Sequence, residues 1–133
     1  MTAASVDRTV VIADDDLDIR LLVETAVRRA GLTVVASVGD GSAALLAVQR
    51  FRPDLVILDV SMPGMTGLEV CRSMRQEPAT ALTPVLIVSA AVHPAALQAA
   101  ADAGVTSHVQ KPFGVKLLVQ QIASLLPPEA PTP

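Results

Sequence analysis

Residues 55–67, with the sequence LVILDVSMPGMTG, contain the pattern that decides the fold class. Four apolar residues, Leu55 to Leu58, are followed by Asp59 and then by a stretch whose Pro and Gly predict a loop. A short, continuously apolar run that ends at polar residues is typical of a strand buried on both faces of a sheet. We therefore predict a parallel sheet with the carboxylate of Asp59 at the carboxyl end of one strand.

The rest of the chain repeats this pattern. Further apolar runs predict strands over residues 10–13, 32–36, 84–88 and 105–110. Apolar residues spaced three and four apart, or runs rich in Ala, predict helices over residues 19–30, 42–50, 70–74, 95–103 and 115–125. Alternating strands and helices with right-handed crossovers give an α/β fold with a doubly wound parallel sheet. Five strands and five helices in this length fit the flavodoxin-like order 2-1-3-4-5.

Composition narrows the class of protein. A chain of 133 residues fits one domain with one core, and 51% hydrophobic against 17% charged residues argues against a disordered chain. With two Phe and no Trp or Tyr, the core is predicted to be aliphatic. A net charge of −3 and the lack of a basic stripe predict no nucleic-acid binding by this domain alone.

The single cysteine and the two ends of the sequence help to predict the cellular compartment of the protein and the bounds of its domain. Cys71 has no partner for an intramolecular disulfide, which suits a reducing compartment. The first residues, MTAASVDRT, lack the order of a signal peptide, and no apolar run approaches the roughly 20 residues that span a bilayer. We predict a cytoplasmic protein outside the membrane, with one domain over residues 1–126 and a Pro-rich tail or linker start over residues 127–133.

Polar side chains stand where the predicted strands end. Asp14 and Asp15 follow the first strand, Asp59 the third, Ser89 the fourth and Lys111 the fifth. Ligands of such sheets bind outside the carboxyl ends of the strands, so these side chains are expected in one pocket. Two carboxylates about 4 Å apart repel by about 4 kcal/mol at an effective dielectric constant of about 20, so a cation must compensate them.

The residue types at these strand ends predict magnesium and phosphoryl chemistry. Oxygen ligands with few protein donors suit Mg²⁺, and no Cys/His spacing indicates zinc. A carboxylate beside Mg²⁺ can act as a nucleophile that forms an aspartyl-phosphate. Phosphoryl transfer needs positioning and charge neutralisation on the phosphoryl oxygens, and Lys111 and Ser89 would each contact one of them.

Four motifs in order resemble the response-regulator receiver family of two-component signalling. They are Asp14-Asp15, the stretch from Leu58 to Gly64, Ser89-Ala90 and Lys111-Pro112-Phe113, and the resemblance runs from about residue 9 to residue 126. It implies that Asp59 is the phosphoacceptor. It also implies that Asp59 and Asp15 bind Mg²⁺ directly, together with the main-chain carbonyl of Ser61, and that Asp14 acts through a metal-bound water.

The resemblance also implies a switch and partners. Lys111 would contact the phosphoryl group, Ser89 would close onto a phosphoryl oxygen, the small Ala90 would leave the site accessible, and the Lys111-Pro112 bond would be cis. His108 stands where the family often has Tyr or Phe, whose ring turns inward on activation, so His108 is either a switch residue or a plain edge-strand residue. The phosphoryl donor would be a phosphohistidine of a sensor histidine kinase or histidine phosphotransfer protein.

The implied output surface is the fourth helix, fifth strand and fifth helix. It would face an output domain, an output protein or a second copy of the domain in a phosphorylation-dependent homodimer. The resemblance implies a signalling domain that catalyses only its own phosphorylation and dephosphorylation.

Other functions remain as alternatives. Asp14 and Asp15 alone could be acids that favour a helix N-terminus, which is the predicted role of Asp16 and Asp18. A phosphatase with an Asp nucleophile would need a second Asp where Ser61 stands. A nucleotide-binding domain would need Gly in the loop after the first strand, where there is none. A receiver-like docking scaffold would share the fold without accepting a phosphoryl group.

Overall fold

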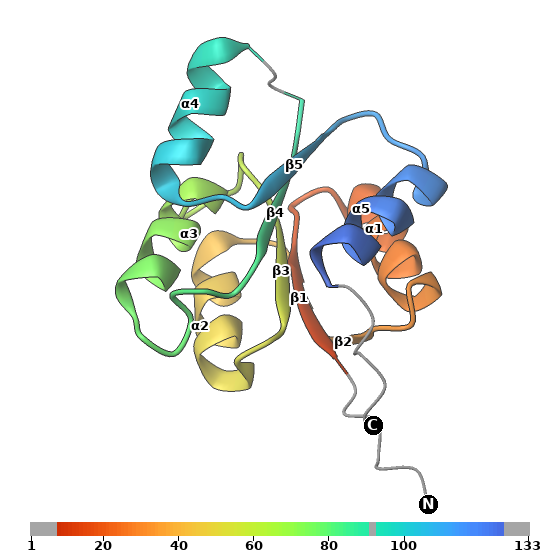
Figure 1. Ribbon diagram of the computed structural model, residues 1–133, viewed down its shortest axis with the longest axis horizontal. Helices are drawn as coiled ribbons and strands as arrows, with labels where there is room; N and C mark the ends of the chain where they lie inside the picture. The colour runs from red at the N-terminus through yellow and green to blue at the C-terminus, as the bar shows by residue number, and fades with distance from the viewer. Residues whose placement is uncertain (1–7, 91–92, 127–133) are drawn as a thin grey trace, which may run out of the picture.

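The computed structural model describes residues 8–90 and 93–126, and the predicted Pro-rich tail, residues 127–133, lies outside them. Strands and helices alternate along this part of the chain (Figure 1). The strands are β1 (Thr9–Ala13), β2 (Thr33–Val38), β3 (Leu55–Asp59), β4 (Val85–Ser89) and β5 (Ser107–Gln110). The helices are α1 (Leu17–Arg29), α2 (Gly41–Phe51), α3 (Gly67–Gln76), α4 (Pro94–Ala103) and α5 (Val115–Leu125).

All strand pairs are parallel, and the sheet has the order β2-β1-β3-β4-β5. The predicted α/β fold and its strand order are therefore confirmed. Val10 lies opposite Leu55, and Asp59 lies opposite Val88, so that β1, β3 and β4 end at the same edge of the sheet. This register places the residues that follow the strands next to one another.

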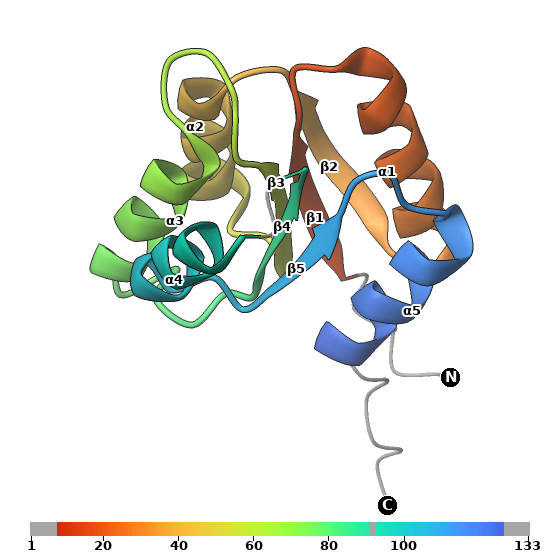
Figure 2. The ribbon, with the colours of Figure 1, turned by 90° about the horizontal axis from the view of Figure 1, so that it is seen from above.

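Helices cover both faces of the sheet (Figure 2). One aliphatic cluster joins β1, β3 and β4 to α2 and α3, and the other joins the opposite faces of the same strands to α1 and α5. Every residue of β3 and β4 is buried, as expected for a strand between two helix layers. Cys71 is completely buried in the first cluster, where it packs as a core residue.

Helix α4 differs from the other helices because it contributes little to the core. It lies beside α3 at the β4–β5 side of the sheet, and only one of its residues, Ala103, is buried. Its other positions are rich in Ala, so each buries little apolar area. The described residues contain no helix long and apolar enough to cross a membrane.

Hydrogen bonds explain where the element boundaries differ from the predicted ones. The fifth strand begins at Ser107 rather than Val105, because the backbone N–H of Val105 donates to the carbonyl of Ala100 at the end of α4. Asp16 caps α1 by accepting from two backbone N–H groups, as predicted. His93 precedes the helix in extended conformation and caps α4, because its Nδ1 accepts from the backbone N–H of Ala96 at 3.1 Å.

Candidate functional site

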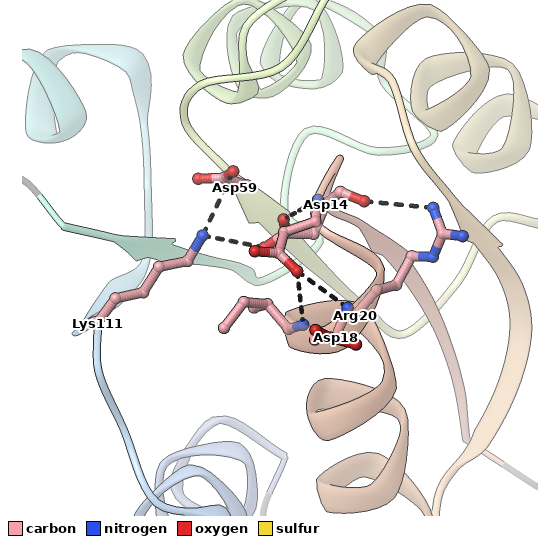
Figure 3. Close-up of polar contacts among 7 residues, drawn as sticks. Asp14, Asp18, Arg20, Asp59 and Lys111 are labelled. Carbon is pink, nitrogen blue, oxygen red and sulfur yellow. Dashed lines mark hydrogen bonds and ion pairs between the residues drawn. The ribbon is translucent and has the colours of Figure 1, made fainter.

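Three of the predicted site residues, Asp14, Asp59 and Lys111, meet at the carboxyl edge of the sheet (Figure 3). Asp14 and Asp15 follow β1, and Asp59 ends β3. Ser89 ends β4 and Lys111 follows β5. They converge because parallel strands that share a register end on one edge. The amide of Lys111 donates to the carbonyl of Ser89 at 2.9 Å, which ties the ends of β4 and β5 together.

Lys111 bridges the two buried carboxylates of the site. Its ammonium nitrogen lies 3.2 Å from Oδ2 of Asp14 and 3.4 Å from Oδ2 of Asp59. Only 3% and 9% of these two carboxylate side chains is exposed, against 19% for Lys111. One cation thus faces two buried anions, and the third carboxylate, Asp15, is exposed beside them.

Hydrogen bonds hold Asp14 on several sides. Its backbone N–H donates to the carbonyl of Val38 at 3.1 Å, and its Oδ1 accepts from the backbone N–H of Asp16 at 2.9 Å. Lys111 contacts the other carboxylate oxygen, so both oxygens of Asp14 have a protein partner. These contacts fix the orientation of the Asp14 carboxylate beside the other two acids.

The three acids are close enough to share a cation. Asp14, Asp15 and Asp59 each offer a carboxylate oxygen, and these oxygens all lie within 4.8 Å of one another. An all-oxygen donor set with an exposed side is the kind that Mg²⁺ uses, because this ion keeps several of its waters. The residues present therefore fit a divalent metal ion.

The electrostatics of Asp59 also favour added positive charge. Burial and then the neighbouring charge of Asp14 raise the pKa of Asp59 above its ordinary value of 3.8, although Lys111 and a hydrogen bond from the backbone of Ser61 act in the opposite direction. Burial alone would lower the pKa of Lys111, but its hydrogen bond to Asp14 and the charge of Asp59 outweigh burial and raise it. Lys111 thus stays charged, yet it does not fully compensate the acids.

A small apolar cavity of about 70 Å³ lies beside the site, between α4 and the sheet. Ser89 and His108 contribute its polar lining, and the rest of its wall is aliphatic. Ala96, Ala99 and Ala100 line it from α4, where their small side chains leave space. His108 is exposed on the edge strand β5, so its prediction as a switch residue stays a prediction.

A sequence model of the response regulator receiver domain matches residues 10–123. The chain belongs to this family. The receiver domain is therefore a signalling domain of two-component systems.

Relatives and solved structures agree with this assignment. The receiver domain is 34% identical over 117 residues to the "DNA-binding response regulator MtrA" of Mycolicibacterium smegmatis, an alignment that covers 88% of the chain but 50% of that protein. It is 33% identical to the "Chemotaxis protein CheY" of Pseudomonas aeruginosa, covering 87% of the chain and 94% of that protein. The structure of CheY4 from Vibrio cholerae matches with a TM-score of 0.84 and 31% identity, covering 91% of the chain and 100% of that structure. The chain thus spans about half the length of the MtrA proteins that it matches.

Glycines shape the receiver domain's β3–α3 loop in a way that sequence reasoning missed. A Cβ on Gly67 would collide with the main-chain carbonyl of Asp59, and one on Gly41 would collide with that of Met65. Thr66 and Glu69 form a capping box at the start of α3, which holds Gly67 in this position. The sequence motif of that box, Thr followed three residues later by Glu, could have located the start of α3 but not the close approach.

Replacing Gly67 by Ala is expected to destabilise the receiver domain by about 1–3 kcal/mol, because the added methyl group must push the main chain of Asp59 aside. Gly114→Ala is the matched control, since nothing lies within 4 Å of a Cβ at that position. Urea unfolding of both variants measures the difference. Equal stabilities of the two variants would contradict the predicted collision.

Proposed function

We propose that the receiver domain accepts a phosphoryl group on Asp59 from a phosphohistidine of a sensor histidine kinase or histidine phosphotransfer protein. The observation that carries the proposal is the group of three carboxylates whose oxygens lie within 4.8 Å of one another, two of which, Asp14 and Asp59, are bridged by the Lys111 ammonium. Such a site needs a divalent cation and can neutralise a transferred phosphoryl group. Mg²⁺ is the proposed cofactor, held by Asp15, Asp59 and the main-chain carbonyl of Ser61, with Asp14 acting through a metal-bound water.

In the proposed reaction, a carboxylate oxygen of Asp59 forms a bond to phosphorus as the P–N bond to the donor histidine breaks. The electron pair of that bond returns to the imidazole, whose leaving nitrogen takes up a proton from solvent. Lys111 donates to one phosphoryl oxygen, which is feasible because its ammonium already lies 3.4 Å from Asp59. Bound Mg²⁺ supplies further neutralisation of charge on the phosphoryl oxygens. The domain catalyses only this transfer and the later loss of its own phosphoryl group.

The proposed response passes through Ser89, His108 and α4. The hydroxyl of Ser89 turns toward a phosphoryl oxygen, and the ring of His108 enters the cavity that both residues line. Because α4 buries only Ala103, its movement disrupts little packing. Phosphorylation would thereby shift a pre-existing equilibrium between two states of the face formed by α4, β5 and α5.

This face is the proposed contact for an output domain, an output protein or a second copy of the chain. MtrA is named as a DNA-binding response regulator, and its match covers only half of that protein. We therefore assign any DNA binding to a separate output domain and none to the receiver domain itself. A cytoplasmic kinase partner would require the receiver domain to be cytoplasmic as well.

Mass spectrometry tests the phosphoryl transfer. The receiver domain is incubated with a small phosphodonor, once with Mg²⁺ and once with Mg²⁺ removed by EDTA. We expect a gain of one phosphoryl group only with Mg²⁺, located by peptide mapping on Asp59. An unchanged mass in Mg²⁺, or a phosphoryl group on a residue other than Asp59, would overturn the proposal.

Filling the cavity tests the proposed response separately. Ala100→Leu is expected to occupy the space that the His108 ring would enter, and so to reduce the phosphorylation-induced change in the NMR shifts of the His108 ring by at least half. Phosphorylation of Asp59 itself should remain. Ala101→Leu is the control, because Ala101 is exposed and does not line the cavity. A full shift change in Ala100→Leu would show that the ring does not enter.

A further inference from the structure

Arg20 joins the site to the neighbouring loop without being one of the predicted site residues. It lies on α1, and its Nη1 donates to the main-chain carbonyl of Asp14 at 3.3 Å (Figure 3). The same nitrogen would lie 3.0 Å from a Cβ on Gly39, in the loop between β2 and α2. Arg20 therefore fills the space that Gly39 leaves by having no side chain.

The hydrogen bond from Arg20 matters because of what it does to Asp15. The carboxylate of Asp15 is exposed, and it has no hydrogen bond or ion pair to any residue within 8–90 and 93–126. Its position therefore depends on the two peptide groups that flank it. The peptide group before Asp15 is held by Arg20, which donates to the carbonyl of Asp14. The peptide group after Asp15 is held by Oδ1 of Asp14, which accepts from the backbone N–H of Asp16 at 2.9 Å.

We propose that Arg20 is a positioning residue, which orients the Asp15 carboxylate for the metal ion by holding the preceding peptide group, with Gly39 providing the space for its guanidinium. This inference rests on the proposed role of Asp15 as a Mg²⁺ ligand. Groups that orient metal ligands through hydrogen bonds typically change metal affinity by about 10-fold to 100-fold when they are removed.

The charge of Arg20 and its hydrogen bond have opposite expected effects on Mg²⁺ affinity. A guanidinium near the acidic cluster repels a cation, so that removing only the charge would raise Mg²⁺ affinity. Removing a positioning contact would lower it. The sign of the change in affinity therefore separates the two roles.

Titration of the full chain with Mg²⁺ alone, followed by NMR shifts, measures the affinity. Arg20→Met is expected to weaken Mg²⁺ binding about tenfold. Gly39→Ala retains the charge of Arg20 but displaces its guanidinium, and should also weaken binding, by a smaller factor. In the Arg20→Met background, Gly39→Ala should add no further loss, because the methyl group then meets no guanidinium. Arg28→Met, an exposed position on the same helix, should bind as the unsubstituted chain does.

A second readout separates positioning from a general loss of structure. The phosphorylation rate of Arg20→Met should return to that of the unsubstituted chain at saturating Mg²⁺, while the half-saturating Mg²⁺ concentration rises about tenfold. Unchanged or tighter Mg²⁺ binding in Arg20→Met, or additive effects of Arg20→Met and Gly39→Ala, would overturn the inference. Failure of the unsubstituted chain to bind Mg²⁺ would instead overturn the proposed function on which it rests.

Discussion

Replacing Asp59 by Asn is expected to abolish phosphoryl incorporation while making the receiver domain more stable at neutral pH. The loss follows because an amide cannot act as the carboxylate nucleophile. The gain in stability follows because burial and the neighbouring charge of Asp14 both disfavour the charged form of Asp59 and so raise its pKa. Asn removes that charge. We expect the midpoint of thermal unfolding to rise by about 4 °C, the shift that about 1 kcal/mol gives in a domain of this size.

The pH dependence of this stabilisation has a definite sign. Because the pKa of Asp59 is raised in the folded state, folding favours its protonated form, and stability is lost as pH rises from the ordinary value of 3.8 through the folded-state value. Asn carries no charge at any pH. The advantage of Asp59→Asn should therefore be present at pH 7 and disappear below pH 3.8, where aspartate is protonated in both states.

Thermal unfolding without Mg²⁺, measured at both pH values, checks this expectation. Asp102→Asn, on the exposed surface of α4, makes the same chemical change away from the acids and should leave the midpoint nearly unchanged at pH 7. A lower midpoint for Asp59→Asn at pH 7 would show that the carboxylate stabilises the fold. The electrostatic account of the site would then be wrong.

Replacing Lys111 by Met is expected to destabilise the receiver domain by about 2–3 kcal/mol at neutral pH. The ammonium of Lys111 bridges Asp14 and Asp59, and removing one partner of a buried ion pair leaves charges uncompensated. Lys111 lowers the pKa of Asp59, so its loss should raise that pKa further. The stability of Lys111→Met should accordingly fall more steeply with rising pH than that of the unsubstituted chain.

Two comparisons make this prediction specific. Lys116→Met removes the same charge from the exposed surface of α5, where a loss below about 1 kcal/mol is expected. Adding Asp59→Asn to Lys111→Met should recover part of the stability, because it removes one of the two unpaired carboxylates. Millimolar Mg²⁺ should stabilise Lys111→Met more than the unsubstituted chain. Equal losses in the two lysine variants would contradict the bridging role of Lys111.

The convergence of Asp14, Asp59 and Lys111 could be predicted from sequence because each residue ends or follows a strand. Parallel strands place their carboxyl ends at one edge, so the order of residues along the chain already implied their proximity. The strand order itself followed from the number and alternation of elements. Capping of α1 by Asp16 could also be predicted, since it depends on neighbours in sequence.

Features that depend on contacts between distant segments could not be predicted. The bond from Arg20 to the carbonyl of Asp14 depends on how α1 turns back against β1, and the space for it depends on Gly39 in another loop. The Ala residues of α4 predicted a helix correctly, but only packing against the sheet shows that they leave a cavity beside His108. The cis bond between Lys111 and Pro112 was expected from family resemblance and is confirmed.

The shallow packing of α4 has a consequence for how such domains diversify. A helix with a single buried side chain, Ala103, can exchange most of its surface residues with little penalty to folding. Meanwhile β3 is buried along its whole length and β1 in all but its first residue, so these two strands tolerate far less change. On the proposed assignment of α4 to the output face, mutation there would alter which molecule reads the signal and leave the proposed phosphoryl chemistry of the acids intact.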